Sequence, residues 1–340
     1  MKKLLLAGCL LASVSTYAVT IDVASPSCGS LSTAQCNALT TELKSVVNED
    51  LPDVSIDKYA VGIANANGFA YKGMGSDYSD IFSYFMVRTA GGLAVQGDLD
   101  DAESAEGIGI GAAFTAGLNL DLLPVDKVGP VDLSKLDVFV SFMSYNVDQD
   151  LDESKAEGDI SSLGVMARYR ILDGIDFIPG SLLSWGGVFL HTGFQRSSFE
   201  LDLTQSFNDE TINVSGGASA NLSNASAKFN LESTTTTIPV EVSTYLRAGY
   251  IFTLFGGAGF DLVTGSTDAS LDASGSVSGT GGYSTTISAN ESDSGDADPT
   301  NLRAFGGLQF NIPFVRLALQ LNKGLGNDLF GVNFGAKILW

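Results

Sequence analysis

Residues 107–122 read GIGIGAAFTAGLNLDL, and this stretch decides the fold class. Every second residue is apolar, so these side chains share one face of an extended strand, while Gly, Ala and polar residues share the other. The run continues for eight matches, beyond the length of about five or six residues that is usual for a soluble strand. It therefore predicts the long, tilted strand of a transmembrane β-barrel. The apolar set is Ile108, Ile110, Ala112, Phe114, Ala116, Leu118, Leu120 and Leu122.

The same alternation recurs elsewhere in the chain, most clearly at residues 237–252. Nine strands are expected besides 107–122, which makes ten in all: 82–96, 136–147, 160–172, 185–203, 237–252, 256–265, 301–312, 314–323 and 329–340. The predicted fold class is all-β, an antiparallel up-and-down transmembrane barrel of about ten strands. The number becomes twelve if residues 54–64 add a hairpin.

The connections between these strands alternate in character, as expected for a barrel threaded from one side of a membrane. One set is mostly long, acidic and rich in Ser, Gly and Asn, and is predicted to be extracellular: 97–106, 148–159, 204–236, 266–300 and 324–328. The other set is mostly short, contains four prolines and is predicted to be periplasmic: 123–135, 173–184, 253–255 and 313. Both termini then lie in the periplasm.

The N-terminus has the features of a secretory signal. Lys2 and Lys3 precede an apolar stretch, and small residues end it at Ala18, so residues 1–18 are expected to be removed. The sequence Leu-Ala-Gly-Cys at 6–9 supplies the alternative of a lipoprotein box, with Cys9 as the first mature residue. Residues 19–80 form either a periplasmic segment or a plug, with a helix near 31–47, and residues 81–340 form the barrel.

Charge and cysteine content restrict the partners and the compartment. Without Lys2 and Lys3, 16 basic residues stand against 39 acidic ones, a net charge of −23 that argues against nucleic acid as a partner. Cys28 and Cys36 are the only cysteines after Ala18, and an oxidising compartment is expected to join them in a disulfide. The sequence indicates no cofactor and no metal.

Seven basic residues fall on the strand face that the alternation assigns to the lumen: Arg88, Arg168, Arg170, Arg247, Arg303, Arg316 and Lys337. A charge that faced lipid would cost about 2 to 4 kcal/mol, which explains why they point inward. It does not explain the excess of positive charge, because inward acids are fewer, chiefly Asp121, Asp137, Glu241 and Asp261. The balancing charge is either a permeating anion, lipopolysaccharide, or a plug formed by the acidic N-terminal segment with Glu42, Glu49, Asp50, Asp53 and Asp57.

Two groups resemble catalytic or metal sites without completing one. His191 is the only histidine and lies mid-strand, so we interpret it as a hydrogen-bonded luminal residue rather than part of an outer-membrane hydrolase. The carboxylates at 148–153 lack the Gly that a calcium loop needs, and they favour a solvated acidic tip. We therefore expect no enzymatic activity.

The C-terminal strand resembles the assembly signal of Gram-negative outer-membrane β-barrels. The residues that carry the resemblance are Val332, Phe334, Ala336, Ile338 and Trp340. It implies an outer-membrane location, recognition by the barrel assembly machinery, and contact with lipid and lipopolysaccharide. Residues 59–88 and 102–128 are also similar to a leptospiral surface-adhesin family with signal peptides and predicted barrels.

Two functions remain open. Surface-exposed loops 204–236 and 266–300 are expected either to bind an extracellular host or prey ligand or to shield the cell surface, since loops of this length are usually functional or disordered. The alternative is a small, porin-like solute channel lined by arginine.

Overall fold

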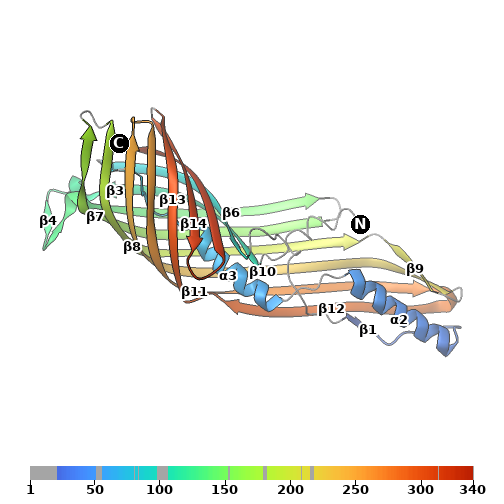
Figure 1. Cartoon of the computed structure of the whole chain (residues 1–340). Helices are drawn as coiled ribbons and strands as arrows, with labels where there is room; N and C mark the ends of the chain where they lie inside the picture. The colour runs from blue at the N-terminus through green and yellow to red at the C-terminus, as the bar shows by residue number, and fades with distance from the viewer. Residues whose placement is uncertain are drawn as a thin grey trace.

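Ten strands form a closed antiparallel ring in the computed structural model, which describes residues 21–50, 56–79, 81–82, 84–97, 106–151, 154–178, 182–207, 209–214, 218–312 and 314–339. Around the ring they are β2 (Phe85–Gln96), β3 (Gly107–Asn119), β6 (Leu136–Leu151), β7 (Ser154–Ile178), β8 (Leu183–Phe207), β10 (Ala218–Ala248), β11 (Phe252–Gly279), β13 (Thr300–Ile312), β14 (Val315–Gly324) and β15 (Leu329–Leu339). The pairing of β15 with β2 closes the ring (Figure 1). The predicted antiparallel barrel of ten strands is confirmed.

The alternative with twelve strands is wrong, because the segment proposed for the extra hairpin is helical. Residues 56–70 form α3 (Ile56–Ala70). From Tyr59 to Ala70 the helix is buried almost all round, as expected for a helix enclosed by other parts of the protein.

The outer surface of the ring is apolar, as a surface facing lipid must be. In β10, for example, Ile238, Val240 and Val242 are each more than 40% exposed, and the ring residues between them are buried. The same holds around the ring, where exposed Leu, Ile, Val and Phe side chains alternate with inward ones. Among the described residues, no helix has the length and the apolar character needed to cross a membrane.

On one side of the barrel the strands continue well beyond the ring and form an open sheet, which we call the extension (Figure 1). It contains residues 143–151, 154–161, 197–207, 218–236 and 264–279 of β6, β7, β8, β10 and β11. Strand β11 changes its neighbour along its length: residues 252–262 pair with β13 in the ring, and residues 266–279 pair with β12 (Tyr283–Asp296) in the extension. Two short strands, β1 (Ile21–Val23) and β9 (Glu210–Val214), add to it.

The extension corrects the prediction of long loops at 148–159, 204–236 and 266–300. These segments are mostly strand, although a Ser, Thr and Gly composition suggested irregular loops. One face of them still alternates: Phe229, Leu231, Ala269 and Val277 are buried on the inner face, and polar residues lie between them. At the tip of the extension, η4 (Thr280–Gly282) joins β11 to β12. The connections at the opposite end are mostly short, except for residues 120–135, which carry η2 (Leu120–Leu122), β4 (Lys127–Val128), β5 (Val131–Asp132) and η3 (Leu133–Lys135).

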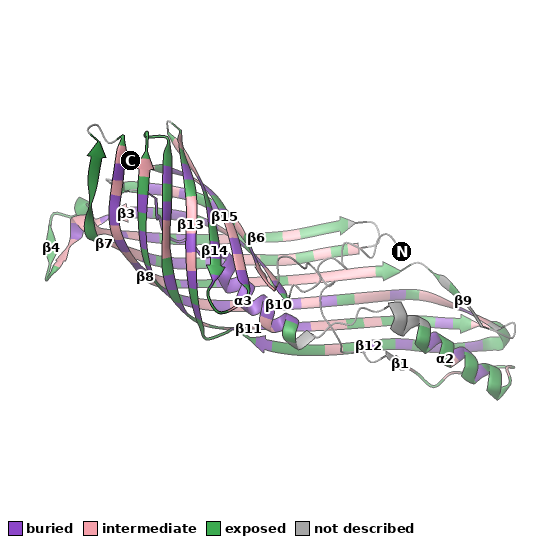
Figure 2. Cartoon of the chain, in the orientation of Figure 1, coloured by how far each residue is buried: buried purple, intermediate pink, exposed green. Residues whose placement is uncertain are grey.

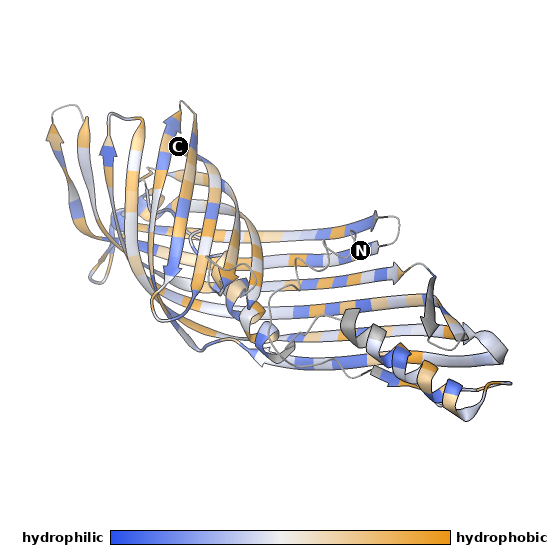
Figure 3. Ribbon diagram, turned by 45° about the vertical axis from the view of Figure 1, so that its right-hand side comes forward, coloured by the Kyte–Doolittle hydropathy of each residue, from blue (hydrophilic) through white to orange (hydrophobic). Residues whose placement is uncertain are grey.

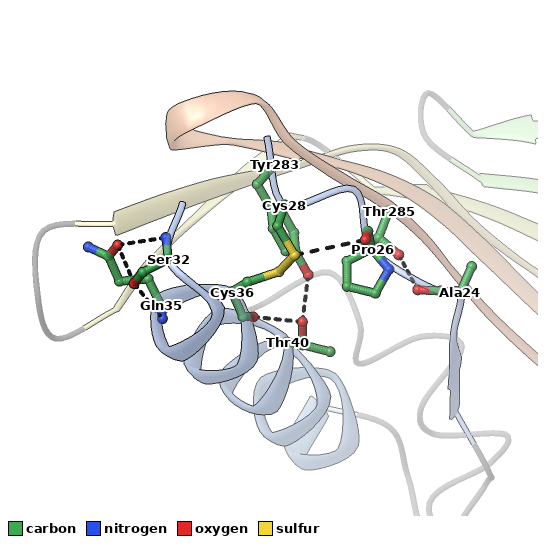
Figure 4. Close-up of a disulfide and its surroundings, with 9 residues drawn as sticks. All are labelled: Ala24, Pro26, Cys28, Ser32, Gln35, Cys36, Thr40, Tyr283 and Thr285. Carbon is green, nitrogen blue, oxygen red and sulfur yellow. Dashed lines mark hydrogen bonds between the residues drawn. A yellow bond between two sulfur atoms is a disulfide. The ribbon is translucent and has the colours of Figure 1, made fainter. Parts of the chain in front are cut away.

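Helix α2 (Thr33–Asp50) packs on the inner face of the extension, close to its tip. Leu39 and Leu43 are buried there against Val277 and Ile287, and Thr40 hydrogen-bonds the hydroxyl of Tyr283 at 3.1 Å. The predicted disulfide between Cys28 and Cys36 is confirmed and holds the start of the helix to the preceding chain (Figure 4). The helix predicted at 31–47 therefore exists but does not enter the lumen, so it is not the plug.

The two ends of the described chain lie at opposite ends of the molecule. Strand β1 pairs with β12 in the extension through Ile21 and Ala289, whereas β15 ends beside Met86 at the other end of the barrel, the turn end. The prediction that both termini share the periplasm is therefore wrong for the described part of the chain. The predicted signal peptide, including Cys9 and Ala18, and Trp340 lie outside the described residues.

Candidate functional site

Residues 56–79, which we call the plug, occupy the lumen of the barrel. They comprise α3 and the non-helical residues 71–79, and Figure 2 shows α3 mostly buried where it enters the ring. Small residues allow backbone to approach backbone: a Cβ on Gly109 of β3 would collide with the carbonyl oxygen of Ala66, and one on Gly62 with that of Glu106. The plug therefore fits against the wall where the wall itself is rich in glycine.

The wall donates hydrogen bonds to the backbone carbonyls of residues 71–79. Arg88 donates to the oxygens of Gly73 and Ser76 at 2.8 and 2.9 Å, and Thr115 donates to that of Met74 at 2.8 Å. Asn333 donates to the carbonyl of Lys72. Because a buried carbonyl without a partner is costly, these bonds explain how a segment without secondary structure is stable inside the barrel.

One charge of the plug lies among cations of the wall. The carboxylate of Asp77 is 2.6 Å from the Lys337 ammonium, and Arg168 donates to the Asp77 backbone oxygen at 2.6 Å. Arg168 also forms an ion pair with Asp137 of β6 at 2.6 Å and lies over the ring of Phe189. We call Arg88, Arg168 and Lys337 the cationic cluster.

A second charge of the plug, Lys72, lies among acids. Lys72 is 3.3 Å from Asp261, and Arg303 bridges Asp261 to Glu241. Tyr78 donates to Glu241 at 2.6 Å. The plug therefore matches the lumen by position: Asp77 lies in the cationic cluster and Lys72 lies beside Asp261.

Of the seven cations assigned to the lumen, the structure buries four and brings three of them together. Arg88, Arg168 and Lys337 surround residues 73–79, and Arg303 lies in the acidic group. Arg170, Arg247 and Arg316 lie nearer the turn end and are partly exposed.

The expectation that the plug cancels a net positive charge is not met, because residues 56–79 carry two acids and two bases, Asp57, Asp77, Lys58 and Lys72. Sequence reasoning missed Lys72 and Asp77, since nothing in the run at 71–79 marks it as luminal.

His191 lies fully buried beneath the plug. Its two ring nitrogens are 2.8 Å from Ser76 Oγ and 2.7 Å from Ser243 Oγ, so the ring joins the plug to β10. This is the hydrogen-bonded luminal position expected from the sequence. In the part of the chain that the structure describes, no group of three His, Cys, Asp or Glu side chains is arranged to hold a metal ion.

The outer face of the extension differs from the lumen: it is polar and acidic, and neither α2 nor α3 covers it. Figure 3 shows orange bands on the strands of the ring and mainly white and blue along the extension. Four acids stand directly opposite one another on adjacent strands, with Asp159 beside Glu200, Glu200 beside Glu232, and Glu232 beside Asp268. All four are exposed. Like charges in such positions repel and destabilise a sheet by up to about 1 kcal/mol a pair.

A second acidic row follows two residues further along the strands. Asp148 lies opposite Glu157, and Glu157 opposite Asp202. Two lysines accompany it: Lys155 is 2.5 Å from Glu157, and this hydrogen bond raises the pKa of Lys155, while Lys228 is 3.5 Å from Asp202. We call the seven carboxylates of the two rows the acidic rows. They stand on the face that neither α2 nor α3 covers.

The inner face of the extension is covered where the plug meets it. Tyr59, in the first turn of α3, packs its ring 6.4 Å from that of Phe229. Burial raises the pKa of Tyr59 to about 12. The helices and the acidic rows therefore lie on opposite faces of one sheet.

Comparison with known proteins gives a family and several distant structures. No curated protein matches the chain significantly. Similar solved structures include the translocator domain of the autotransporter NalP from Neisseria meningitidis, at 11% identity and a TM-score of 0.34, covering 76% of this chain and 89% of that one. They also include the transport unit of the autotransporter AIDA-I from Escherichia coli, at 9% identity and 0.29, covering 80% and 96%. A third is Ail, the attachment invasion locus protein of Yersinia pestis, at 13% identity and 0.24, covering 76% and 99%.

A family model described as Lsa36-like matches residues 18–340. The match includes residues 59–88 and 102–128, which carry the sequence resemblance to a surface-adhesin family, and it spans the plug, the ring and the extension. The chain belongs to the Lsa36-like family.

Proposed function

We propose that this chain is an outer-membrane barrel that holds the extension on the cell surface, where the acidic rows bind a basic extracellular partner. The apolar belt ends with the ring, and among the described residues the outer face of the extension has no large exposed apolar side chain. A sheet of this kind belongs in water and not in lipid.

The acidic rows are the observation that carries the proposal. Seven carboxylates share one face with two lysines, and each carboxylate stands opposite another acid on a neighbouring strand. A face that only shields the cell needs no such arrangement, because scattered hydroxyl groups give the same hydration. A basic partner would relieve the repulsion on binding, and long-range attraction would speed its arrival.

Two features of the barrel support this orientation. The connections at the turn end are mostly short, as periplasmic turns are in such barrels. In β15 the residues Val332, Phe334, Ala336 and Ile338 lie on the outward face, which supports a role in recognition by the assembly machinery and contact with lipid and lipopolysaccharide. The extension then lies outside the cell.

Surface binding is favoured over a porin-like solute channel because the plug fills the lumen that a solute would cross. Hydrogen bonds and ion pairs hold the plug at the cationic cluster and beside Asp261. A channel would require the plug to leave, whereas the outer face of the extension needs no rearrangement to bind.

The test is a pair of substitutions that removes two negative charges from the first acidic row, Glu200→Gln with Glu232→Gln. The full-length protein in lipid nanodiscs is titrated with a lysine-rich peptide as the probe. We expect the affinity at low salt to fall on the order of tenfold, because each exposed charge contributes up to about 1 kcal/mol, and we expect the loss to shrink as salt rises.

The matched control also removes two negative charges, but at the turn end, with Asp121→Asn and Asp126→Asn. Both residues are exposed, and the control should bind like the wild type. The row variant should also unfold at a higher temperature than the wild type, since repulsion is relieved. Equal affinity of the row variant, the control and the wild type would refute the proposed function.

A further inference from the structure

The chain crosses the barrel once, from the extension to the turn end. Residues 21–50 lie on the extension, Tyr59 packs on Phe229 at its base, and Gly68 lies against Thr235 further along β10. Asp77 then meets Lys337, and Phe82 packs on Phe139 close to the turn end, where β2 begins. The plug is thus a length of chain passing through the lumen.

Because of this path, residues 21–50 and the start of β2, the first strand of the ring, lie at opposite ends of the lumen. The ring is closed by hydrogen-bonded strands on every side. Residues 21–50 are therefore joined to the barrel sequence only through the lumen. Once the ring has closed, residues 21–50 cannot reach the extension from the other side of the membrane without passing through the lumen.

We propose that residues 21–50 reach the cell surface through the lumen of their own barrel, and that residues 56–79 are the part of the chain left inside it. The inference rests on the proposed function for its orientation, in which the extension is outside. It adds an activity to that function: the barrel transports its own N-terminal segment.

The extension provides a binding surface for residues 21–50 once they have left the lumen. Strand β1 pairs with the edge of β12, and Ala24 accepts a hydrogen bond from Thr285 at 2.7 Å. Cys36, Leu39 and Leu43 are buried on Tyr283, Val277 and Ile287. Burying this apolar surface favours the segment on the outer side, and so gives the passage a direction without an external energy source.

The helical part of the plug lies close to β3 because small residues meet there: Gly62 and Ala66 of α3 lie backbone to backbone against Glu106 and Gly109. The buried charges Lys72 and Asp77 both lie in the non-helical part. The one covalent crosslink ahead of the plug closes a small loop between Cys28 and Cys36, so the segment stays narrow after oxidation.

The first test locates the segment on intact cells. Lys44 is exposed on α2, and Lys44→Cys in a Cys28→Ser/Cys36→Ser background supplies a single thiol after residue 18. Ser276→Cys in the same background reports the extension independently. We expect a membrane-impermeant maleimide to label both.

The outcomes separate the inference from the proposed function. Labelling at residue 276 without labelling at 44 overturns the inference and leaves the orientation intact. Protection at 276 overturns the orientation and the inference with it.

The second test addresses the route and keeps both native cysteines. A small disulfide-bonded domain that folds in the periplasm is fused ahead of residue 19, and a cysteine-free, unfolded version of the same domain serves as the control. An epitope in the fused domain is read with an antibody on intact cells.

We expect the unfolded version to be surface-accessible and the folded version to lose at least tenfold in antibody signal, because a folded domain cannot pass a lumen of ten strands. Equal surface signals from the two versions would overturn passage through the lumen.

Discussion

At the scale of the residue, we consider the carboxylate of Asp77 first, because the stability of the protein depends on its buried ion pair. It is 2% exposed and faces Lys337 inside the cationic cluster. Removing one partner of a buried ion pair costs about 3 to 5 kcal/mol, because a charge remains in a medium that solvates it poorly. We expect Asp77→Asn to lower the urea midpoint of the full-length protein in lipid vesicles accordingly.

A double substitution distinguishes this pairing from a general loss of packing. Asp77→Asn with Lys337→Met removes both charges, so it should recover part of the stability that the single variant loses. Asp126→Asn, at an exposed position, is the control and should leave the midpoint unchanged. A single variant as stable as this control would contradict the role given to Asp77.

The sequence predicted one half of this cluster and not the other. Strand alternation placed Arg88, Arg168 and Lys337 on the inward face, because a charge on the lipid face is too costly. It said nothing of Asp77, whose position depends on the path of a segment without periodicity. The acids of the N-terminal helix were the more obvious counter-charges, yet Glu42 is exposed on α2, outside the lumen.

At the scale of the element, the packing of α3 against β3 depends on glycine in the wall. We expect Gly109→Ala to push α3 away from the wall, because the added Cβ would collide with the Ala66 carbonyl, and overpacking of this kind costs about 1 to 3 kcal/mol. Hydrogen exchange of the α3 amides should then accelerate about tenfold.

The matched control is Gly91→Ala on the neighbouring strand. The nearest atom to its Cβ would be the Gly111 oxygen at 3.8 Å, an ordinary contact. Its α3 amides should exchange at the wild-type rate. Equal exchange in the two variants would mean that α3 is not held by this contact.

The elements of the ring were predictable and those of the extension were not, for one physical reason. Ring strands face lipid on one side, so their outward residues are apolar and the alternation is strong. Strands of the extension face water, and their outward residues are Ser, Thr, Asn and Asp, as in Ser270, Asp272 and Ser274 of β11. Composition then suggested loops, although Ala269, Leu271 and Ala273 kept the period of two.

At the scale of the whole molecule, the extension on one side of the barrel explains why the two ends of the described chain lie at opposite ends of the molecule. The extension continues five ring strands and offers a face to which residues 21–50 bind, while β15 ends at the turn end. Sequence reasoning counted an even number of strands and placed both termini together. That rule holds for the strands of the ring but not for a chain whose first segment passes through it.

The orientation of the barrel is the claim on which the proposed function depends, and accessibility of single cysteines on intact cells tests it most directly. Ser276, on the outer face of the extension, and Val128, in the hairpin at the turn end, are both exposed. We expect an impermeant maleimide to label Ser276→Cys on intact cells, and Val128→Cys only after the outer membrane is permeabilised. Labelling of Val128→Cys on intact cells together with protection of Ser276→Cys would contradict the account.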